Sequence, residues 1–344
     1  MDPYSPSNRT MHGMDRRRLL VVVAGAIAGA LVVVAVAVAG RGGGQGTAAA
    51  QNARPLHGMP PLLLRLPAAL APRAGESAAA RLARLRRSGD ASRDGLLALA
   101  VGAAEIDVGN ARGAAQAFDQ AAGTLGANDG RVEVARALLR YDATQPQPAL
   151  AALDRIAAAR PSDQLPRFER GVVLLYAGQD GAATSVLRQV RAHDPGGLYG
   201  GRADDLLHPG MLPGPPFWIA ARPAPVGTPL ALAAKLEGEG RREAALAAAR
   251  RAVSRDPASV DAAVAVAVLG FDKDQPSLAF GALGNLARSF PSAASPVFHL
   301  GVLLLWIGQP ARAKTEFQKA AALDPQGRIG QVARRLAVLH SGRG

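Results

Sequence analysis

The 344-residue sequence contains no cysteine, which excludes disulfide bonds, thiolate metal sites and a lipid-modified cysteine behind a signal sequence. Aromatic residues are also scarce, at 4% of the chain, so a hydrophobic core has to be built from Leu, Val and Ala. Alanine has the highest helix propensity, and its small side chain lets helices pack closely. The composition therefore favours a protein made of closely packed α-helices.

Lysine occurs only at positions 235, 273, 314 and 319, so the net charge of +13 comes almost entirely from arginine. The arginines are scattered along the chain, and their densest groups are Arg16 to Arg18 and the cluster from Arg81 to Arg87. A nucleic-acid-binding surface needs a concentrated basic face to neutralise phosphates. The scattered distribution argues against nucleic acid as a partner.

The motifs of common catalytic sites are missing. The sequence has no GxxxxGK[ST] phosphate loop, no GxSxG nucleophile elbow and no HExxH zinc pair. Its histidines lie far apart in sequence, and we interpret His299 as a surface or groove residue. Asp204-Asp205 and Asp272 with Asp274 would need further oxygen ligands to bind a cation, so we interpret them as caps of helices and turns. We therefore expect no catalytic residue, no metal and no cofactor.

A long apolar run lies near the N-terminus. Residues 1–18 are polar and end in three arginines, which predicts a disordered cytoplasmic segment. Residues 19–39 are uncharged and apolar throughout, and about 20 such residues suffice to cross a bilayer as a helix. The arginines keep the N-terminus in the cytoplasm, so the following domain would lie outside. The alternative is a signal peptide cut after Ala37-Val38-Ala39, although its apolar core would be unusually long.

Gly25 and Gly29 form a GxxxG pair inside this predicted membrane helix. Such a face lets two membrane helices approach and dimerise, although small residues are frequent throughout this chain. Residues 40–75 begin Gly-rich and become Pro-rich, which predicts a tether that is flexible first and stiffer later. Its short apolar patch from Leu62 to Leu66 is a candidate for docking on the domain that follows.

Residues 295–325 contain two amphipathic helical patterns, one directly after the other. A Leu-Gly pair lies in the first pattern, a glycine marks the turn, an apolar stripe follows in the second, and a proline ends it: Leu300-Gly301, Gly308, Ala313, Phe317, Ala320 and Pro325. The pair resembles a tetratricopeptide repeat (TPR), a helix–turn–helix unit of about 34 residues.

The same pattern recurs at this period. Gly240, Asp274 and Gly308 occupy successive turns, and a proline follows each of them at the same spacing: Pro257, Pro291 and Pro325. The earlier half of the chain repeats the scheme. Six units result, near residues 95–128, 130–163, 164–197, 226–259, 260–293 and 294–327.

In addition to the repeat of about 34 residues, a longer repeat relates the first half of the chain to the second. Identical residues recur at one fixed offset: Phe168 and Phe298, Gly171 and Gly301, Gly200 and Gly330, Leu206 and Leu336. Each triplet of units should thus end in an extra helix that covers its open face. We predict a first block at residues 76–208, a Pro-rich connector at 209–228 and a second block at 229–340. The predicted fold is all-α, a TPR-like helical solenoid of two duplicated three-unit blocks behind one transmembrane helix.

The resemblance also implies a partner surface, because the first helices of TPR units line a concave groove. The matching positions are apolar and aromatic: Phe168, Val172, Leu175, Tyr176, Phe298, Val302, Leu305 and Trp306, with Val134, Leu138, Tyr141, Val264, Val268 and Phe271 in neighbouring units. Such a groove suits an extended peptide or a partner's helix. Alternatively, the connector or the other block already fills it. Phe217 and Trp218 in the connector are either an exposed hook for a partner or pack across the junction of the blocks.

Together these observations predict a non-enzymatic scaffold or adaptor that binds a protein or peptide. It would be anchored in the cytoplasmic membrane with its repeat domain on the outer side. The alternatives are a homo-oligomeric structural protein of the envelope, joined through the membrane helix or the groove, and a secreted TPR protein after signal cleavage.

Overall fold

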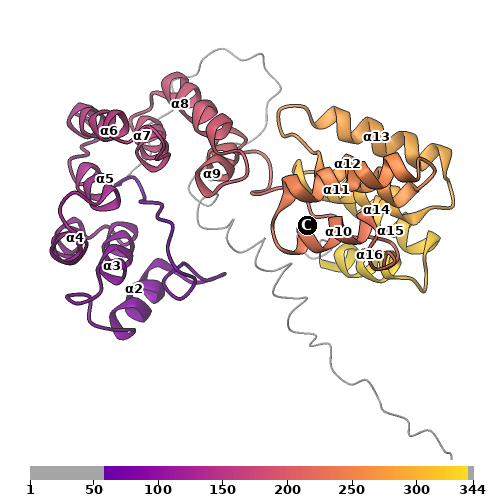
Figure 1. Cartoon of the computed structure of the whole chain (residues 1–344), viewed down its shortest axis with the longest axis horizontal. Helices are drawn as coiled ribbons and strands as arrows, with labels where there is room; N and C mark the ends of the chain where they lie inside the picture. The colour runs from indigo at the N-terminus through magenta and orange to yellow at the C-terminus, as the bar shows by residue number, and fades with distance from the viewer. Residues whose placement is uncertain (1–57, 340–344) are drawn as a thin grey trace, which may run out of the picture.

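The computed structural model describes residues 58–339, and within this range the chain forms fifteen α-helices (Figure 1). They are α2 (Ala78–Arg87), α3 (Gly95–Asp107), α4 (Ala111–Leu125), α5 (Gly130–Leu138), α6 (Gln147–Ala159), α7 (Leu165–Tyr176), α8 (Asp180–His193), α9 (Leu198–Leu207), α10 (Pro229–Gly238), α11 (Arg242–Arg255), α12 (Val260–Leu269), α13 (Pro276–Ser289), α14 (Ala294–Trp306), α15 (Pro310–Leu323) and α16 (Arg328–Leu339). The prediction of an all-α helical repeat is confirmed.

None of the helices between residues 58 and 339 is long and apolar enough to span a bilayer. The predicted membrane helix at residues 19–39, its face at Gly25 and Gly29, and the first part of the tether lie outside the described residues.

Successive helices pair as antiparallel hairpins, and glycine makes the turns possible. Gly178 and Gly308 have φ angles of 70° and 75°, which an L side chain rarely adopts. The residue after each glycine then donates its N–H back to the end of the first helix, as in the 2.8 Å bond from Gln309 to the Leu304 carbonyl. These turns close a helix pair within a few residues and set the short repeat.

A second glycine lets the two helices of a pair approach. A Cβ on Gly301 in α14 would lie 2.7 Å from the ring of Phe317 in α15, and a Cβ on Gly102 in α3 would lie 2.2 Å from the ring of Phe118 in α4. Both phenylalanines are fully buried. The Leu-Gly signal in the sequence therefore marks the contact point between the first and second helices of a unit.

An extra helix closes each block, with α9 packed on α8 and α16 packed on α15. Both begin in the same way, because the carboxylates of Asp194 and Asp324 accept the N–H groups of Gly200 and Gly330, each at 3.2 Å. A Cβ on either glycine would lie 1.7 Å from a backbone carbonyl oxygen. The two blocks thus share the chemistry of their ends as well as their helix order.

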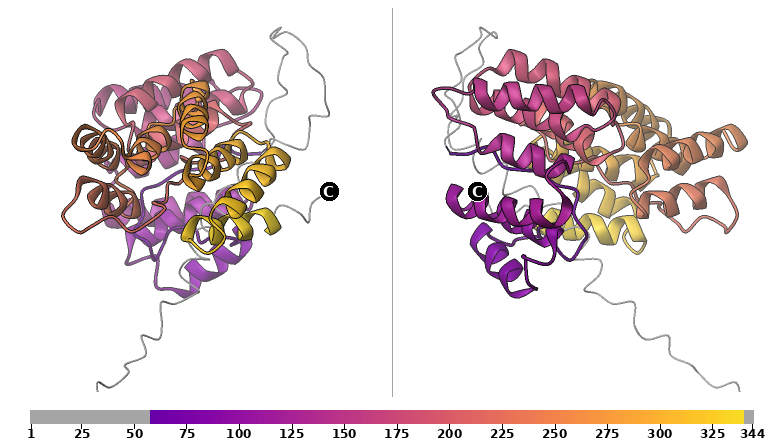
Figure 2. Two further views of the ribbon diagram at one scale, coloured as in Figure 1. Left: turned by 90° about the vertical axis from the view of Figure 1, so that its right-hand side faces the viewer. Right: turned by 60° about the vertical axis from the view of Figure 1, so that its left-hand side comes forward.

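The blocks form two separate groups of helices in Figure 1, and Figure 2 shows the same groups from two further sides. Between them lies a cluster of ion pairs. Lys273, which follows α12, contacts Asp205 at 2.8 Å and Asp204 at 3.3 Å, both in α9. Asp274 binds His208 at 2.8 Å and also pairs with Arg191. Asp204 and Asp205 therefore join the blocks, rather than capping a helix.

Candidate functional site

The concave face of the second block is lined by α14 and filled by the connector. Phe298, Val302, Leu305 and Trp306 are all buried there. Phe217 places its ring 6.2 Å from that of Phe298 and 5.9 Å from that of Trp306, both edge-on. We call this face the second groove, and residues 211–221 the connector segment.

Hydrogen bonds fix the connector segment in place. The Trp306 indole N–H donates to the Gly214 carbonyl at 3.0 Å, and the Leu212 N–H donates to the Trp306 carbonyl at 2.8 Å. Trp218 is 4% exposed and packs among α10, α11 and α12. Phe217 and Trp218 therefore form no exposed hook, because both are packed against the second block.

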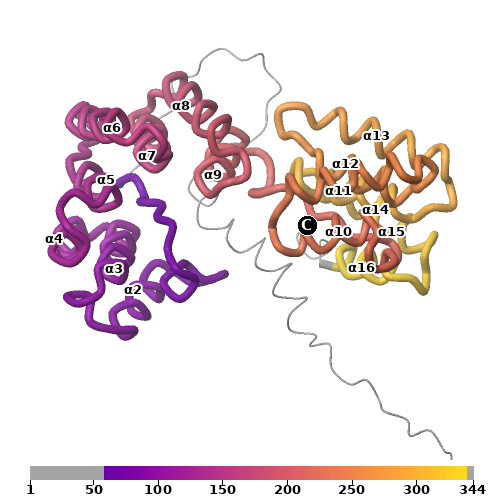
Figure 3. The backbone as a smooth tube through the Cα atoms, viewed as in Figure 1, coloured from indigo at the N-terminus to yellow at the C-terminus, as the bar shows by residue number. Residues whose placement is uncertain are grey.

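The concave face of the first block, here the first groove, also holds a segment of the chain itself. Residues 59–66, the resident segment, are drawn in indigo before α2 in Figure 3 and run past α5 and α7. Leu62 and Leu64 are buried in the same core as Phe168 and Val172. Leu175 and Tyr176, at the end of α7, remain partly exposed.

Each groove holds its segment through one buried polar side chain on the first helix of the third unit. The Leu63 N–H donates to Glu169 Oε1 at 2.7 Å, and the Ile219 N–H donates to His299 Nε2 at 3.2 Å. Glu169 and His299 occupy equivalent positions of the long repeat, and both are fully buried. The segments match as well, because the residues on either side of the donors, at 62, 64, 218 and 220, are buried. The long repeat thus includes the groove and its occupant.

Burial shifts the pKa of both acceptors toward the neutral form. It raises the pKa of Glu169 to about 8, against a smaller lowering effect of the Leu63 N–H. It lowers the pKa of His299 to about 4. His299 Nδ1 lies 2.8 Å from the Ser295 carbonyl and so carries the proton, which leaves Nε2 free to accept from Ile219.

The two grooves differ in polarity. Tyr141, Tyr176 and Tyr199 of the first block stand where the second has Phe271, Trp306 and Ile329. The rings of Tyr141 and Tyr176 meet edge-on at 6.3 Å. Burial and the nearby charge of Asp107 raise the pKa of Tyr176. The first groove is therefore a polar, acidic variant of an otherwise aromatic surface.

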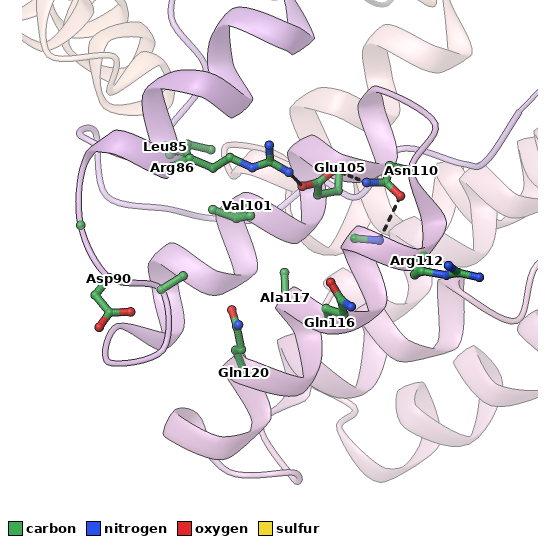
Figure 4. A pocket seen from close by; sticks show the side chains of 13 residues that line it. Leu85, Arg86, Asp90, Val101, Glu105, Asn110, Arg112, Gln116, Ala117 and Gln120 are labelled. Carbon is green, nitrogen blue, oxygen red and sulfur yellow. Dashed lines mark hydrogen bonds and ion pairs between the residues drawn. The ribbon is translucent and has the colours of Figure 1, made fainter.

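A separate pocket of about 400 Å³ lies between α2, α3 and α4 (Figure 4). Its buried carboxylate, Glu105, pairs with Arg86 and accepts from the Asn110 amide at 2.9 Å. Asn110 in turn accepts the Gly113 N–H at 3.1 Å and caps α4. These groups bind one another and fasten three helices together. No group of His, Asp and Glu residues within positions 58–339 has the arrangement of a metal site.

Glu169 and His299 were not singled out as a pair by the sequence. His299 was interpreted as a surface or groove residue, and the structure buries it completely. The signal they share is a titratable residue directly after Phe168 and Phe298, at equivalent places in the long repeat, although Arg167 and Arg170 flank Glu169 and hide it.

No protein-family model and no curated protein sequence matches this chain. Among solved structures, a tetratricopeptide repeat protein from Parabacteroides merdae is 15% identical, with 78% of this chain and 91% of that chain covered and a TM-score of 0.27. The P58(IPK) TPR domain is 12% identical, with 76% and 67% covered and a TM-score of 0.25. A MamA RS-1 double mutant is 19% identical, with 57% and 93% covered and a TM-score of 0.23.

Such low TM-scores carry no argument, so the assignment rests on the helices themselves. Antiparallel helix pairs recur at a period of about 34 residues, which is the period of TPR units. Four of the pairs turn through a glycine with positive φ, and each block closes with an extra helix. In its described residues the chain is therefore a TPR-like, all-α helical repeat protein.

Proposed function

We propose that the protein is a non-enzymatic adaptor whose first groove binds an extended segment of a partner protein in place of residues 59–66. The observation that carries this is the resident segment itself. It lies in the groove with two buried leucines and one backbone N–H bound to Glu169, which is how an extended peptide is held. The groove is therefore shaped for such a ligand.

The first groove is the exchangeable one because its occupant is held weakly. The free energy gained by burying Leu62 and Leu64 is opposed by the conformational entropy lost when the backbone of the segment is ordered. The resident segment also precedes α2, so it joins no two of the helices between residues 58 and 339.

The connector segment has no such freedom. It joins α9 to α10, and Trp306 binds it at Leu212 and Gly214. The Arg242 guanidinium also donates to the Pro216 carbonyl at 3.0 Å. The second groove is accordingly a structural joint, and partner binding at Phe298, Val302, Leu305 and Trp306 would require the blocks to separate.

We further propose that residues 19–39 anchor this adaptor in the cytoplasmic membrane, with the repeat domain on the outer side. The support is the apolar run and the three arginines before it. Protease added to intact spheroplasts should digest residues 58–339 and spare the N-terminus. Protection of the repeat domain would overturn this orientation.

The groove itself is tested by opening it in the full chain. Leu62→Asp with Leu64→Asp should expel the resident segment, and a labelled peptide of residues 58–67 should then bind in trans. Adding Phe168→Asp to this variant should abolish that binding. Leu278→Asp, at a leucine that is 66% exposed on α13, is the matched control and should not create binding. A folded Leu62→Asp/Leu64→Asp variant that ignores the peptide would contradict the proposal.

A further inference from the structure

The first groove contains polar groups that its resident segment leaves without a partner. Glu169 is fully buried, and its Oε1 accepts from Leu63, but its Oε2 has no hydrogen-bond partner. The Tyr141 hydroxyl is also buried and without a partner. Buried polar groups are normally paired, because an unmade hydrogen bond there costs about 1–3 kcal/mol. The resident segment therefore leaves two buried polar groups of the groove unsatisfied.

In the second block the residue equivalent to Glu169 has no unpaired atom, although the indole N–H of Trp218 in the connector segment is buried without a partner. His299 uses both ring nitrogens, one toward Ser295 and one toward Ile219. Trp306, at the position of Tyr176, gives its indole N–H to the Gly214 carbonyl. The open carboxylate oxygen is thus a property of the first groove and not of the repeat.

The groups around Glu169 favour a positive charge. Tyr176 lies beside Tyr141 and is partly exposed, and tyrosine rings attract cations over their faces. Asp107 is close enough to act on Tyr176, although its carboxylate is already paired with Arg81 at 3.0 Å. A lysine or arginine side chain would favour release of the proton from the neutral Glu169 carboxyl and would then donate to the carboxylate that forms.

The resident segment does not supply that charge. Its one basic residue, Arg65, is exposed, and its charge acts on Tyr199 rather than on Glu169. A neutral amide of a partner could hydrogen-bond Glu169 Oε2 but could not form an ion pair with it. A basic partner segment would also overcome the advantage that the resident segment gains from being attached to the same chain.

We propose that the partner segment recognised by the first groove carries a lysine or arginine whose charged end pairs with Glu169 beside Tyr141 and Tyr176. This inference rests on the proposed function and names the chemistry of its ligand. Binding would exchange a half-paired carboxyl for a complete ion pair at the floor of the groove.

The test uses the full chain with Leu62→Asp and Leu64→Asp, and peptides of residues 58–67. In one series lysine replaces each residue from 61 to 66 in turn, and in a matched series glutamine does. Fluorescence anisotropy should show one position at which lysine binds about tenfold or more tightly than glutamine. Glu169→Gln added to the protein should remove that preference, and Tyr176→Leu should reduce it.

The outcomes separate the two proposals. If the unmodified peptide binds but lysine never exceeds glutamine, the basic-partner inference is overturned and the groove remains a peptide site. A lysine preference that persists in a folded Glu169→Gln protein would also overturn the inference. If no peptide of either series binds, both proposals fail.

Discussion

Glu169 should make the stability of the first block depend on pH in an unusual direction. Burial raises its pKa from 4.5 to about 8 in the folded protein. A carboxyl with a raised folded-state pKa contributes its stability below pH 4.5. That stability is lost as pH rises, since the unfolded chain releases the proton first. Most carboxylates have the opposite effect.

The magnitude follows from the two pKa values. Each pKa unit corresponds to about 1.4 kcal/mol, so the free energy of unfolding should fall by about 4–5 kcal/mol between pH 4.5 and pH 8. Glu169→Gln keeps the size of the side chain and an acceptor for the Leu63 N–H, but it cannot ionise. Wild type and variant should have similar stability near pH 5, and the variant should be several kcal/mol more stable at pH 8.

The assay is urea unfolding of the full chain, followed by circular dichroism and by tryptophan fluorescence. Both tryptophans, Trp218 and Trp306, lie in or against the second block, so fluorescence reports that block alone. The difference between wild type and Glu169→Gln should appear in circular dichroism and in hydrogen exchange of α7. If the two proteins keep the same difference in stability from pH 5 to pH 8, the buried and half-paired state of Glu169 is refuted.

Three further predictions concern the frame around the grooves. Because burial lowers the pKa of His299 to about 4, the wild-type protein should lose about 3 kcal/mol of unfolding free energy as the pH falls from 6.5 to 4. His299→Gln should not show this loss, and unfolding followed by tryptophan fluorescence measures the difference. Gly301→Ala should destabilise α14 against α15 by about 1–3 kcal/mol, whereas Gly281→Ala, where a Cβ meets nothing within 4 Å, should be neutral or stabilising in thermal melts. Lys273→Met should loosen the contact with α9 and raise the radius of gyration in X-ray scattering; an unchanged radius would show that the connector alone sets the junction.

The helical architecture was predictable because its signals are local. A turn glycine such as Gly308 needs a positive φ, and Gly301 must lack a side chain where α14 meets α15. The turn glycine recurs as Gly109, Gly178, Gly240 and Gly308, so it appears as a period in the sequence. A helix pair can therefore be located from a few positions, even where no protein family matches.

The occupants of the grooves were less accessible to sequence reasoning. Residues 59–66 and 211–221 are Pro-rich and extended, and they have no helical period that fixes their place. The sequence alone is compatible with a connector that fills a groove and with one that does not. The apolar patch from Leu62 to Leu66 is recognisable as a docking segment, but its composition does not indicate where it docks. Which groove a segment enters depends on contacts between residues far apart in the chain, such as Leu63 with Glu169 and Ile219 with His299, which no local pattern contains.

The roles of Asp204, Asp205 and Glu169 also depend on contacts with residues far away in the sequence. An aspartate pair such as Asp204-Asp205 has the sequence signature of a cap, and only the approach of Lys273 across the junction makes it an ion-pair site. Glu169 has the appearance of a solvent-facing residue on an amphipathic helix. Its burial depends on the resident segment, which is far away in sequence.

The most direct measurement of the central claim is hydrogen exchange of two amides in the intact protein, those of Leu63 and Ile219. Each is the backbone donor that binds its segment to a groove. If the first groove is an exchangeable peptide site and the second a structural joint, Leu63 should exchange at least a hundredfold faster than Ile219. A competing peptide that occupies the first groove should remove the remaining protection of Leu63 and leave that of Ile219 unchanged. Equal, strong protection of both amides would show that the two segments are alike parts of the fold, and would contradict the account.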